Sequence, residues 1–182
     1  MINNIQDYIS YFQQLANEHV EINDFYIMDI NEPLMAMRGE MQYPALILNA
    51  LAGNLLSRNL DCTLDQVKGG FLIVGHLAQL DDFTGEMELL RQMKAIGGEI
   101  IARMVHDVYK CELRAVKAIP GFDINTVQYQ MIDGIFENGF GFLFNFTITS
   151  LMDLEYDATR WNKTEVVSDI YPDRTRGPLP HH

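Results

Sequence analysis

Histidines are the side chains in this chain most suited to acid–base chemistry. His76 follows an apolar segment, and His106 stands beside Asp107 near the end of a long helical pattern. General acid–base catalysis needs a histidine close to a nucleophile or inside a pocket, and the sequence identifies neither partner. We therefore interpret His76 and His106 as structural or surface residues, and we expect His19 at the edge of the core.

Three carboxylates form a second candidate group. Asp153, Glu155 and Asp157 alternate along the sequence, so an extended chain places them on one side. Such a set can bind a hard cation such as Ca²⁺. Carboxylates on a strand edge also prevent edge-to-edge aggregation, and we favour this second interpretation.

A glycine-containing segment, Gly69–His76, superficially matches a phosphate-binding loop. It lacks the Lys-Ser/Thr pair of such loops, and its glycines bracket an apolar strand instead of opening a helix. The sequence thus predicts no catalytic residue, no metal ligand and no cofactor, and we do not expect an enzyme.

Charge and cysteine content restrict the classes of function further. The 182 residues carry a formal net charge of −12, which disfavours binding to nucleic acid through phosphates. The same charge would let nucleic acid pass without sticking, although it is also common in proteins that are merely soluble. The two cysteines, Cys62 and Cys111, lie far apart and indicate free thiols in a reducing compartment.

The beginning of the chain has no basic stretch followed by an apolar one, so we predict no signal peptide. No apolar run reaches the length of about 18 residues that a membrane-spanning helix needs. We therefore expect a soluble cytoplasmic product, or an assembly formed in the cytoplasm.

Two segments have the spacing of amphipathic helices. Residues 3–20 place apolar side chains three and four positions apart, and residues 84–110 repeat the pattern from Met87 to Val108. The pair Gly97-Gly98 inside the second helix lowers its helix propensity by about 1–2 kcal/mol relative to alanine. Close approach of another backbone, or a kink, would explain these glycines.

Several shorter segments are typical of β-strands. We predict strands at 25–30, around Met35 and Met37, at 43–48, 70–77 and 112–119, and a connector without regular structure at 53–68.

The strongest strand pattern lies between residues 126 and 149. Thr126–Ile132 alternates in polarity, Asn138-Gly139 is a typical hairpin turn, and every second residue from Phe140 to Ile148 is apolar. We predict an antiparallel hairpin whose four phenylalanines lie on one face, covered by the long helix. The fold class is α+β, with a mixed, mainly antiparallel sheet flanked by an N-terminal helix and one long central helix. Residues 1–159 form one domain, and residues 160–182 form an extended C-terminal arm.

This order of elements resembles the tail-terminator and tail-completion proteins of long-tailed bacteriophages and related tail-like particles. The resemblance covers about residues 1–150, including the early apolar strand Tyr43–Leu48 and the closing strand Gly141–Ile148. It implies a structural protein of the virion, assembled in the bacterial cytoplasm, which forms a ring that is usually sixfold. Such a ring ends tail-tube growth and joins the tube to the head connector, while DNA passes without specific binding.

Candidate interface residues follow from composition. Methionine-rich surface is adaptable, and a large aromatic residue outside the core often anchors an interface. We select Met35, Met37 and Met41, although core packing is the more common role of such methionines, and we select Trp161. If the resemblance holds, the arm with Trp161, Arg174 and Arg176 straps an adjacent subunit.

Two alternatives to the ring protein stay open. One is a monomeric adaptor or ligand-binding module. The other is an enzyme with a pocket between helix 84–110 and the sheet, using His76 or His106.

Overall fold

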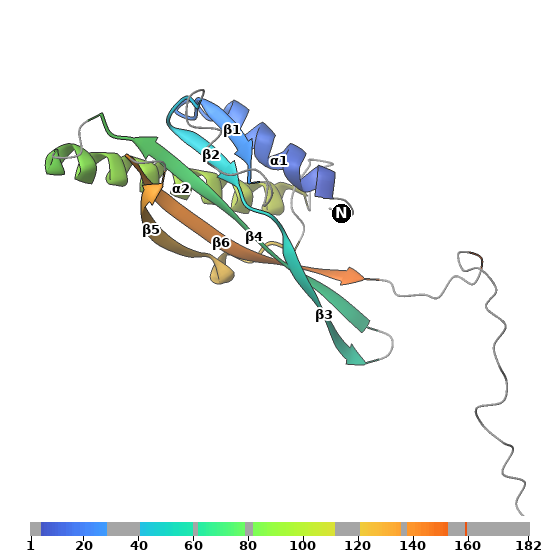
Figure 1. Cartoon of the computed structure of the whole chain (residues 1–182). Coiled ribbons are helices and arrows are strands. Elements are labelled where there is room, and N and C mark those ends of the chain that lie inside the picture. The colour runs from blue at the N-terminus through green and yellow to red at the C-terminus, as the bar shows by residue number, and fades with distance from the viewer. Residues whose placement is uncertain are drawn as a thin grey trace, which may run out of the picture.

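The computed structural model describes residues 5–28, 41–59, 62–78, 82–111, 121–135, 138–152 and 159. In these residues, two α-helices pack on a six-stranded sheet with the order β1-β2-β4-β6-β5, and β3 pairs with β4 (Figure 1). The pair β1–β2 is parallel, and the other pairs are antiparallel. The predicted α+β class, with an N-terminal and a long central helix, is confirmed.

Helix α1 (Ile5–Glu18) confirms the helix predicted from the first amphipathic pattern. Its buried residues are Tyr8, Tyr11, Phe12, Leu15 and Ala16, which recur at the spacing of one helix face. The ring of Phe12 lies inside the core, 5.6 Å from the ring of Phe71 between centroids. The aromatic stripe of α1 therefore anchors this helix to the sheet.

Strands β1 (Asp24–Ile27) and β2 (Ala45–Leu48) correspond to the strands predicted at 25–30 and 43–48, with shorter bounds. All four residues of β2 are buried, as expected for a strand covered on both faces. The predicted strand around Met35 and Met37, and the one at 112–119, lie outside the described residues.

The connector predicted at 53–68 is wrong. These residues form β3 (Ala52–Asn59) and the first half of β4 (Cys62–His76), which pair as an antiparallel hairpin. Both faces of this hairpin are largely solvent-accessible, so its sequence lacks the alternation that marks a half-buried strand. Strand β4 consequently extends eight residues further towards the N-terminus than the segment 70–77 indicated.

Helix α2 (Phe83–Cys111) confirms the long central helix and covers the face of the sheet that carries the phenylalanines. Its buried stripe consists of Leu90, Met93, Ile96, Ile100, Ile101 and Met104. Met87 was expected in this stripe but is exposed, because Leu89 is the residue that reaches Gly75 of β4.

The packing around Gly97 explains why a glycine, with its low helix propensity, stands inside α2. A Cβ atom at this position would overlap the ring of Phe144, whereas a Cβ at Gly98 would meet nothing within 4 Å. The close approach that the sequence indicated is thus made by an aromatic ring and not by another backbone. Gly97 lets α2 lie directly on the aromatic face of β6.

Strands β5 (Gln128–Ile135) and β6 (Gly139–Met152) form the predicted hairpin. Phe140, Phe144, Phe146 and Ile148 are buried and Phe142 is partly buried, so the aromatic face is covered as expected. Both helices take part, since Phe12 of α1 stacks on Phe146 at 5.9 Å between ring centroids.

The turn of this hairpin differs from the prediction. Gly139 already belongs to β6, where it pairs with Ile135, and the glycine with positive φ is Gly134, at 67°. The register shifts between Ile132 and Ile135, which indicates a bulge at Gly134. Thr126, the first residue of the predicted strand, is instead the last residue of a short 3-10 helix, Ile124–Thr126.

Candidate functional site

His76 lies apart from His106, the other histidine considered for acid–base chemistry. It ends β4, and its ring lies 5.3 Å from the ring of Tyr43 between centroids. The preceding residue, Gly75, contacts Leu89 near the beginning of α2. His106 lies 17 residues later on the same helix, which corresponds to about 25 Å along its axis.

The space between α2 and the sheet is filled by apolar side chains. Met93, Ile96, Ile100, Met104 and Phe144 are all buried there. Among the described residues, His76 and His106 therefore share no pocket at this interface.

His19 lies at the edge of the core, as predicted. Its Nε2 atom is 3.0 Å from Oε2 of Glu99, and only 11% of its side chain is exposed. This contact joins the end of α1 to α2.

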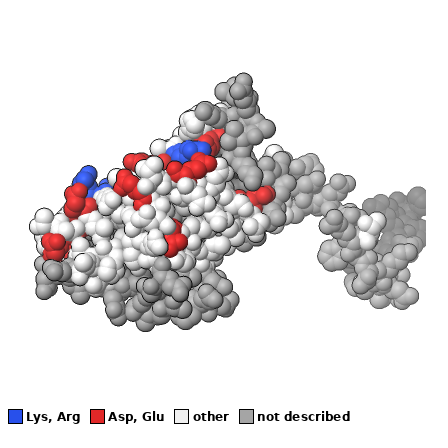
Figure 2. All heavy atoms as spheres, turned by 90° about the horizontal axis from the view of Figure 1, so that it is seen from above, with Lys and Arg blue, Asp and Glu red and all other residues white. Residues whose placement is uncertain are grey.

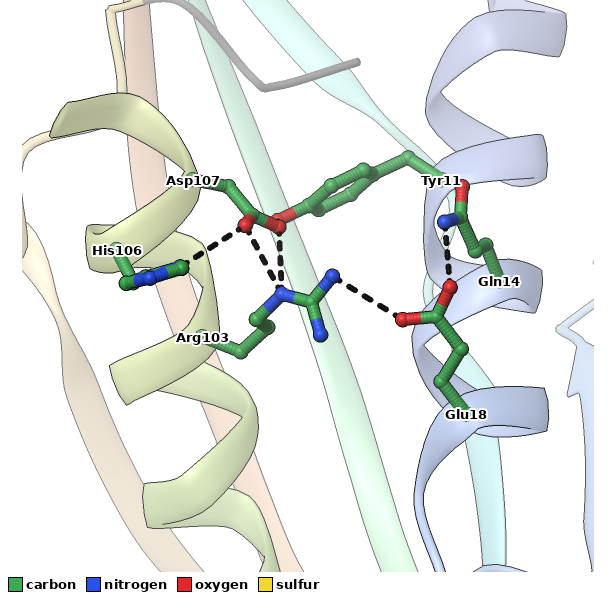
Figure 3. A network of polar contacts seen from close by, with 6 residues as sticks. All are labelled: Tyr11, Gln14, Glu18, Arg103, His106 and Asp107. Atoms are coloured by element: carbon green, nitrogen blue, oxygen red, sulfur yellow. Dashed lines mark hydrogen bonds and ion pairs between the residues drawn. The ribbon is translucent and has the colours of Figure 1, made fainter. Parts of the chain in front are cut away.

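Asp107 is a buried carboxylate that links the two helices (Figure 3). The hydroxyl of Tyr11 in α1 donates to Oδ2 of Asp107 at 3.1 Å. Nε of Arg103, one turn earlier in α2, donates to both carboxylate oxygens at 2.9 and 3.0 Å. Burial of the phenol, followed by the charge of Asp107, raises the pKa of Tyr11, so the phenol remains a donor.

The remaining members of this network lie closer to solvent. Arg103 also pairs with Oε2 of Glu18 at 3.1 Å, and Gln14 donates to the other oxygen of Glu18 at 2.6 Å. Nδ1 of His106 is 3.3 Å from Oδ1 of Asp107. The hydrogen bond to Asp107 raises the pKa of Arg103. Because these groups already satisfy one another, the network acts as a clamp between α1 and α2.

A polar groove of about 600 Å³ lies on the other side of the sheet. Gly69 faces Tyr8 and Phe146 in the core, whereas its neighbour Gly70 faces Asn49 and Asn145. Adjacent strand residues point to opposite faces, so the groove opens on the face away from α1. The groove is lined by Asn49, Ala50, Ala52, Lys68, Gly69, Gly70, Thr126, Gln128, Asn145, Phe146 and Thr147.

Two rows of residues across the strands form this groove. One row runs from Ala52 through Lys68 to Thr147, and the other from Gly70 through Asn145 to Gln128. The hydroxyl of Thr126 accepts from the Thr147 backbone N–H at 2.9 Å and closes the end of the first row. Gly70 has no side chain, and Asn145 and Asn49 fill the space that a Cβ atom there would occupy.

The charge in the groove is opposite to that of the whole chain. Lys68 is the one charged residue in the lining, which contains no Asp or Glu, while the chain has a net charge of −12. In the described part of the chain, Lys68 forms no ion pair. Oδ1 of Asn49 is buried and has no hydrogen-bond partner there. The groove thus offers an uncompensated cation.

A three-stranded ribbon projects from the body of the fold. It consists of β3, the first half of β4 and the end of β6, and it extends beyond both helices (Figure 1). Leu55, Leu56, Leu151 and Met152 on this ribbon are exposed by 41–71%. Leu56 and Leu151 flank Leu64 on one face, so the ribbon carries an apolar row that no described segment covers.

The edges of the ribbon are also open. Among the described residues, β3 pairs with β4 alone, which leaves the outer edge of β3 without a strand. The outer edge of β6 is closed up to Thr149, whose N–H donates to the Gly121 carbonyl at 3.0 Å. The projecting ribbon is therefore open on its apolar row and on one long edge.

Of the interface residues selected from the sequence, Met41 alone is described. It is buried against Ala45, Ile47, Leu72 and Val74, so it packs within the fold. Trp161, Arg174, Arg176, Met35 and Met37 lie outside the described residues, as do Asp153, Glu155 and Asp157. Their roles remain predictions.

Sequence reasoning missed both the groove and the ribbon. A usable signal was the pair Leu55-Leu56 beside a hairpin of polar residues, because exposed leucines without alternation mark a contact surface. The groove had a weaker signal, since its residues come from four separate segments of the sequence.

Side chains of opposite sign intermingle on the side of the molecule seen in Figure 2, with Asp and Glu more frequent than Lys and Arg. Within the described ranges, no group of three or more His, Cys, Asp and Glu side chains is arranged to hold a metal ion. No helix in these ranges is long and apolar enough to cross a membrane.

Comparison with models of known protein families finds no match to this chain, and comparison with curated proteins finds none either.

Proposed function

We propose that this chain is a structural protomer that assembles with copies of itself into a ring, as the cap of a phage or phage-like tail tube and its joint to the head connector. The order of elements that resembles tail-completion proteins supports this proposal. The observation that carries it is the projecting ribbon with its exposed leucines.

The ribbon has the properties of a surface made for contact. Exposed apolar side chains that cluster on a soluble protein mark interaction sites. An open strand edge offers unpaired backbone N–H and C=O groups, which proteins otherwise protect with charges, bulges or covering segments. In this ribbon Leu55 and Leu56 stand on the open edge strand itself. A neighbouring protomer that covers these leucines would bury the apolar row and form hydrogen bonds with the unpaired backbone groups at the edge of β3.

The proposed contact joins two different surfaces, since the apolar ribbon of one protomer lies against another region of the next. A contact of this kind generates a ring when the rotation between protomers closes. The net charge of −12 fits a ring through which DNA passes without binding.

A second candidate function, a ligand-binding module, is favoured by the polar groove. A monomeric ligand-binding module would bind its ligand in the groove, but its function would not explain an apolar ribbon that is exposed to solvent. The two candidates therefore differ in what they predict for the mass of the particle.

The test is the mass of the purified protein in solution, measured by light scattering across concentration. We expect a particle several times heavier than the 20.9 kDa chain, and a shift towards 20.9 kDa for the double variant Leu56→Ser/Leu151→Ser. Val20→Ser is the matched control, because Val20 is 94% exposed but lies in the turn after α1 and outside the ribbon.

Two results would contradict the proposal. One is a wild-type mass of 20.9 kDa up to about 1 mM, where even an association of about 4 kcal/mol is populated. The other is a double variant that assembles as well as the wild type.

A further inference from the structure

The dimensions of the polar groove fit an extended peptide. Its two rows cross four neighbouring segments, and strands lie about 4.8 Å apart, so the groove is about 14 Å long. Four residues of extended chain span about 13 Å. The volume of about 600 Å³ is within the range of about 300–1,000 Å³ that is usual for ligand sites.

The lining determines the chemistry of the occupant. Lys68 supplies an unpaired positive charge, which favours a carboxylate. Gln128 and Asn145 add amides that donate and accept. A carboxylate with neighbouring N–H groups is the chemistry of an acidic peptide segment.

The chain itself contains a segment of this kind. Asp153, Glu155 and Asp157 follow directly on Met152, the last residue of β6. From Thr147 in the groove, β6 continues in register with β4 through Met152. Those five residues place Met152, after which the acidic segment begins in the sequence, about 17 Å from Thr147.

We propose that the groove of one protomer binds the acidic segment 153–157 of a second copy, with a carboxylate at Lys68 and backbone groups at the side-chain amides of Gln128 and Asn145. This inference rests on the proposed ring function, because it makes the end of one ribbon contact the base of the next. Such a contact joins two different surfaces and gives the assembly a direction.

The first experiment measures binding of the segment alone. The probe is a dye-labelled peptide with the sequence of residues 151–159, and the receptor is the full chain with Asp153→Asn, Glu155→Gln and Asp157→Asn, which leaves the groove free. We expect saturable binding that weakens with salt, and at least tenfold weaker binding to a receptor that also carries Lys68→Glu. Lys68→Arg should retain binding.

Two controls give this experiment its specificity. Lys94→Glu removes a lysine that lies over the ring of Tyr129, outside the groove, and should leave peptide binding unchanged. A peptide with Asn, Gln and Asn in place of the acidic residues should bind at least tenfold more weakly. Equal binding to the Lys68→Glu receptor, or glutarate binding as tightly as the peptide, would overturn the proposal.

The second experiment tests whether the segment comes from another copy. The Lys68→Glu chain has an intact acidic segment but an impaired groove. The chain with the three neutral substitutions has an intact groove but no acidic segment. In a mixture, the segment of the first chain can therefore bind in the groove of the second. We expect the mixture to contain more heavy complexes than either variant alone. A mixture that behaves as the sum of its components, while the wild type assembles, would overturn binding in trans.

The outcomes separate this inference from the proposed function. Peptide binding to a wild type that stays monomeric at all concentrations would show that the groove is filled by the segment of its own chain, and would contradict both the contact between copies and the ring. A wild type that assembles without any peptide binding would support the ring and contradict the groove.

Discussion

The strands β4 and β6 pair along their whole length but pass through two different environments. Where Phe71 pairs with Phe144, both rings are buried beneath the helices and stack at 5.2 Å between centroids. Where Leu64 pairs with Leu151, the strands lie beyond the helices and Leu151 is 71% exposed. One ladder of hydrogen bonds thus joins a packed body to an uncovered ribbon (Figure 1).

The body of the fold therefore supplies the stability of the chain, whereas the ribbon supplies the surface for contact with a partner. Burial of large aromatic side chains stabilises the body, and the register established there continues into the ribbon. The ribbon contributes little packing of its own, so its leucines remain available to a partner. Substitutions in the two halves should therefore have different consequences for the isolated chain.

The largest expected effect is at Phe144. Phe144→Ala removes a buried ring that packs on Gly97 and Phe71, and should lower the free energy of unfolding by about 3–5 kcal/mol. Leu151→Ala on the same strand should change it by less than about 0.5 kcal/mol. Denaturant unfolding monitored by circular dichroism measures both. A cost at Leu151 in the monomer similar to that at Phe144 would refute the division into body and ribbon.

An intermediate effect is expected where α2 touches the sheet. Gly97→Ala places a methyl group against the Phe144 ring and should cost about 1–3 kcal/mol in spite of a better helix propensity. Gly98→Ala, which meets open space, should instead stabilise the chain by up to about 1 kcal/mol. Midpoints of thermal unfolding distinguish the two substitutions, and equal shifts in the same direction would show that the contact is not tight.

A smaller effect is expected at the clamp between the helices. Tyr11→Phe keeps the ring but removes one hydrogen bond to Asp107, and should cost about 0.5–1.5 kcal/mol. Asp107→Ala leaves the buried Tyr11 hydroxyl without its acceptor and should cost about 1–3 kcal/mol. If Asp107→Ala were as stable as the wild type by urea unfolding, the network would not hold the helices together.

The body was predictable from the sequence because a helix or strand with one buried face has apolar residues at a regular spacing. The alternation from Phe140 to Ile148 and the stripe of α2 follow directly from one covered face. The position of Gly97 was also informative, although only the structure shows that Phe144 fills the space it leaves.

The ribbon and the groove were not predictable for the same physical reason. Neither face of the segment 52–67 is packed on a helix, so its residues show no period of two and read as a connector. In the groove, Lys68 and Asn145 become neighbours through the register of β4 and β6, which no local pattern encodes. Met87 was misplaced because Leu89, two positions later, is the residue at the beginning of α2 that reaches Gly75 of β4.

Amide hydrogen exchange across protein concentration tests the central claim most directly, because it observes the ribbon and the body in the same sample. We predict that amides of β4 from Phe71 to Val74 stay protected at every concentration, since these residues are buried. Amides of β3 should exchange rapidly in the dilute chain and become protected as assembly proceeds. Rapid exchange of β3 in assembled particles would contradict the claim that the ribbon joins the protomers.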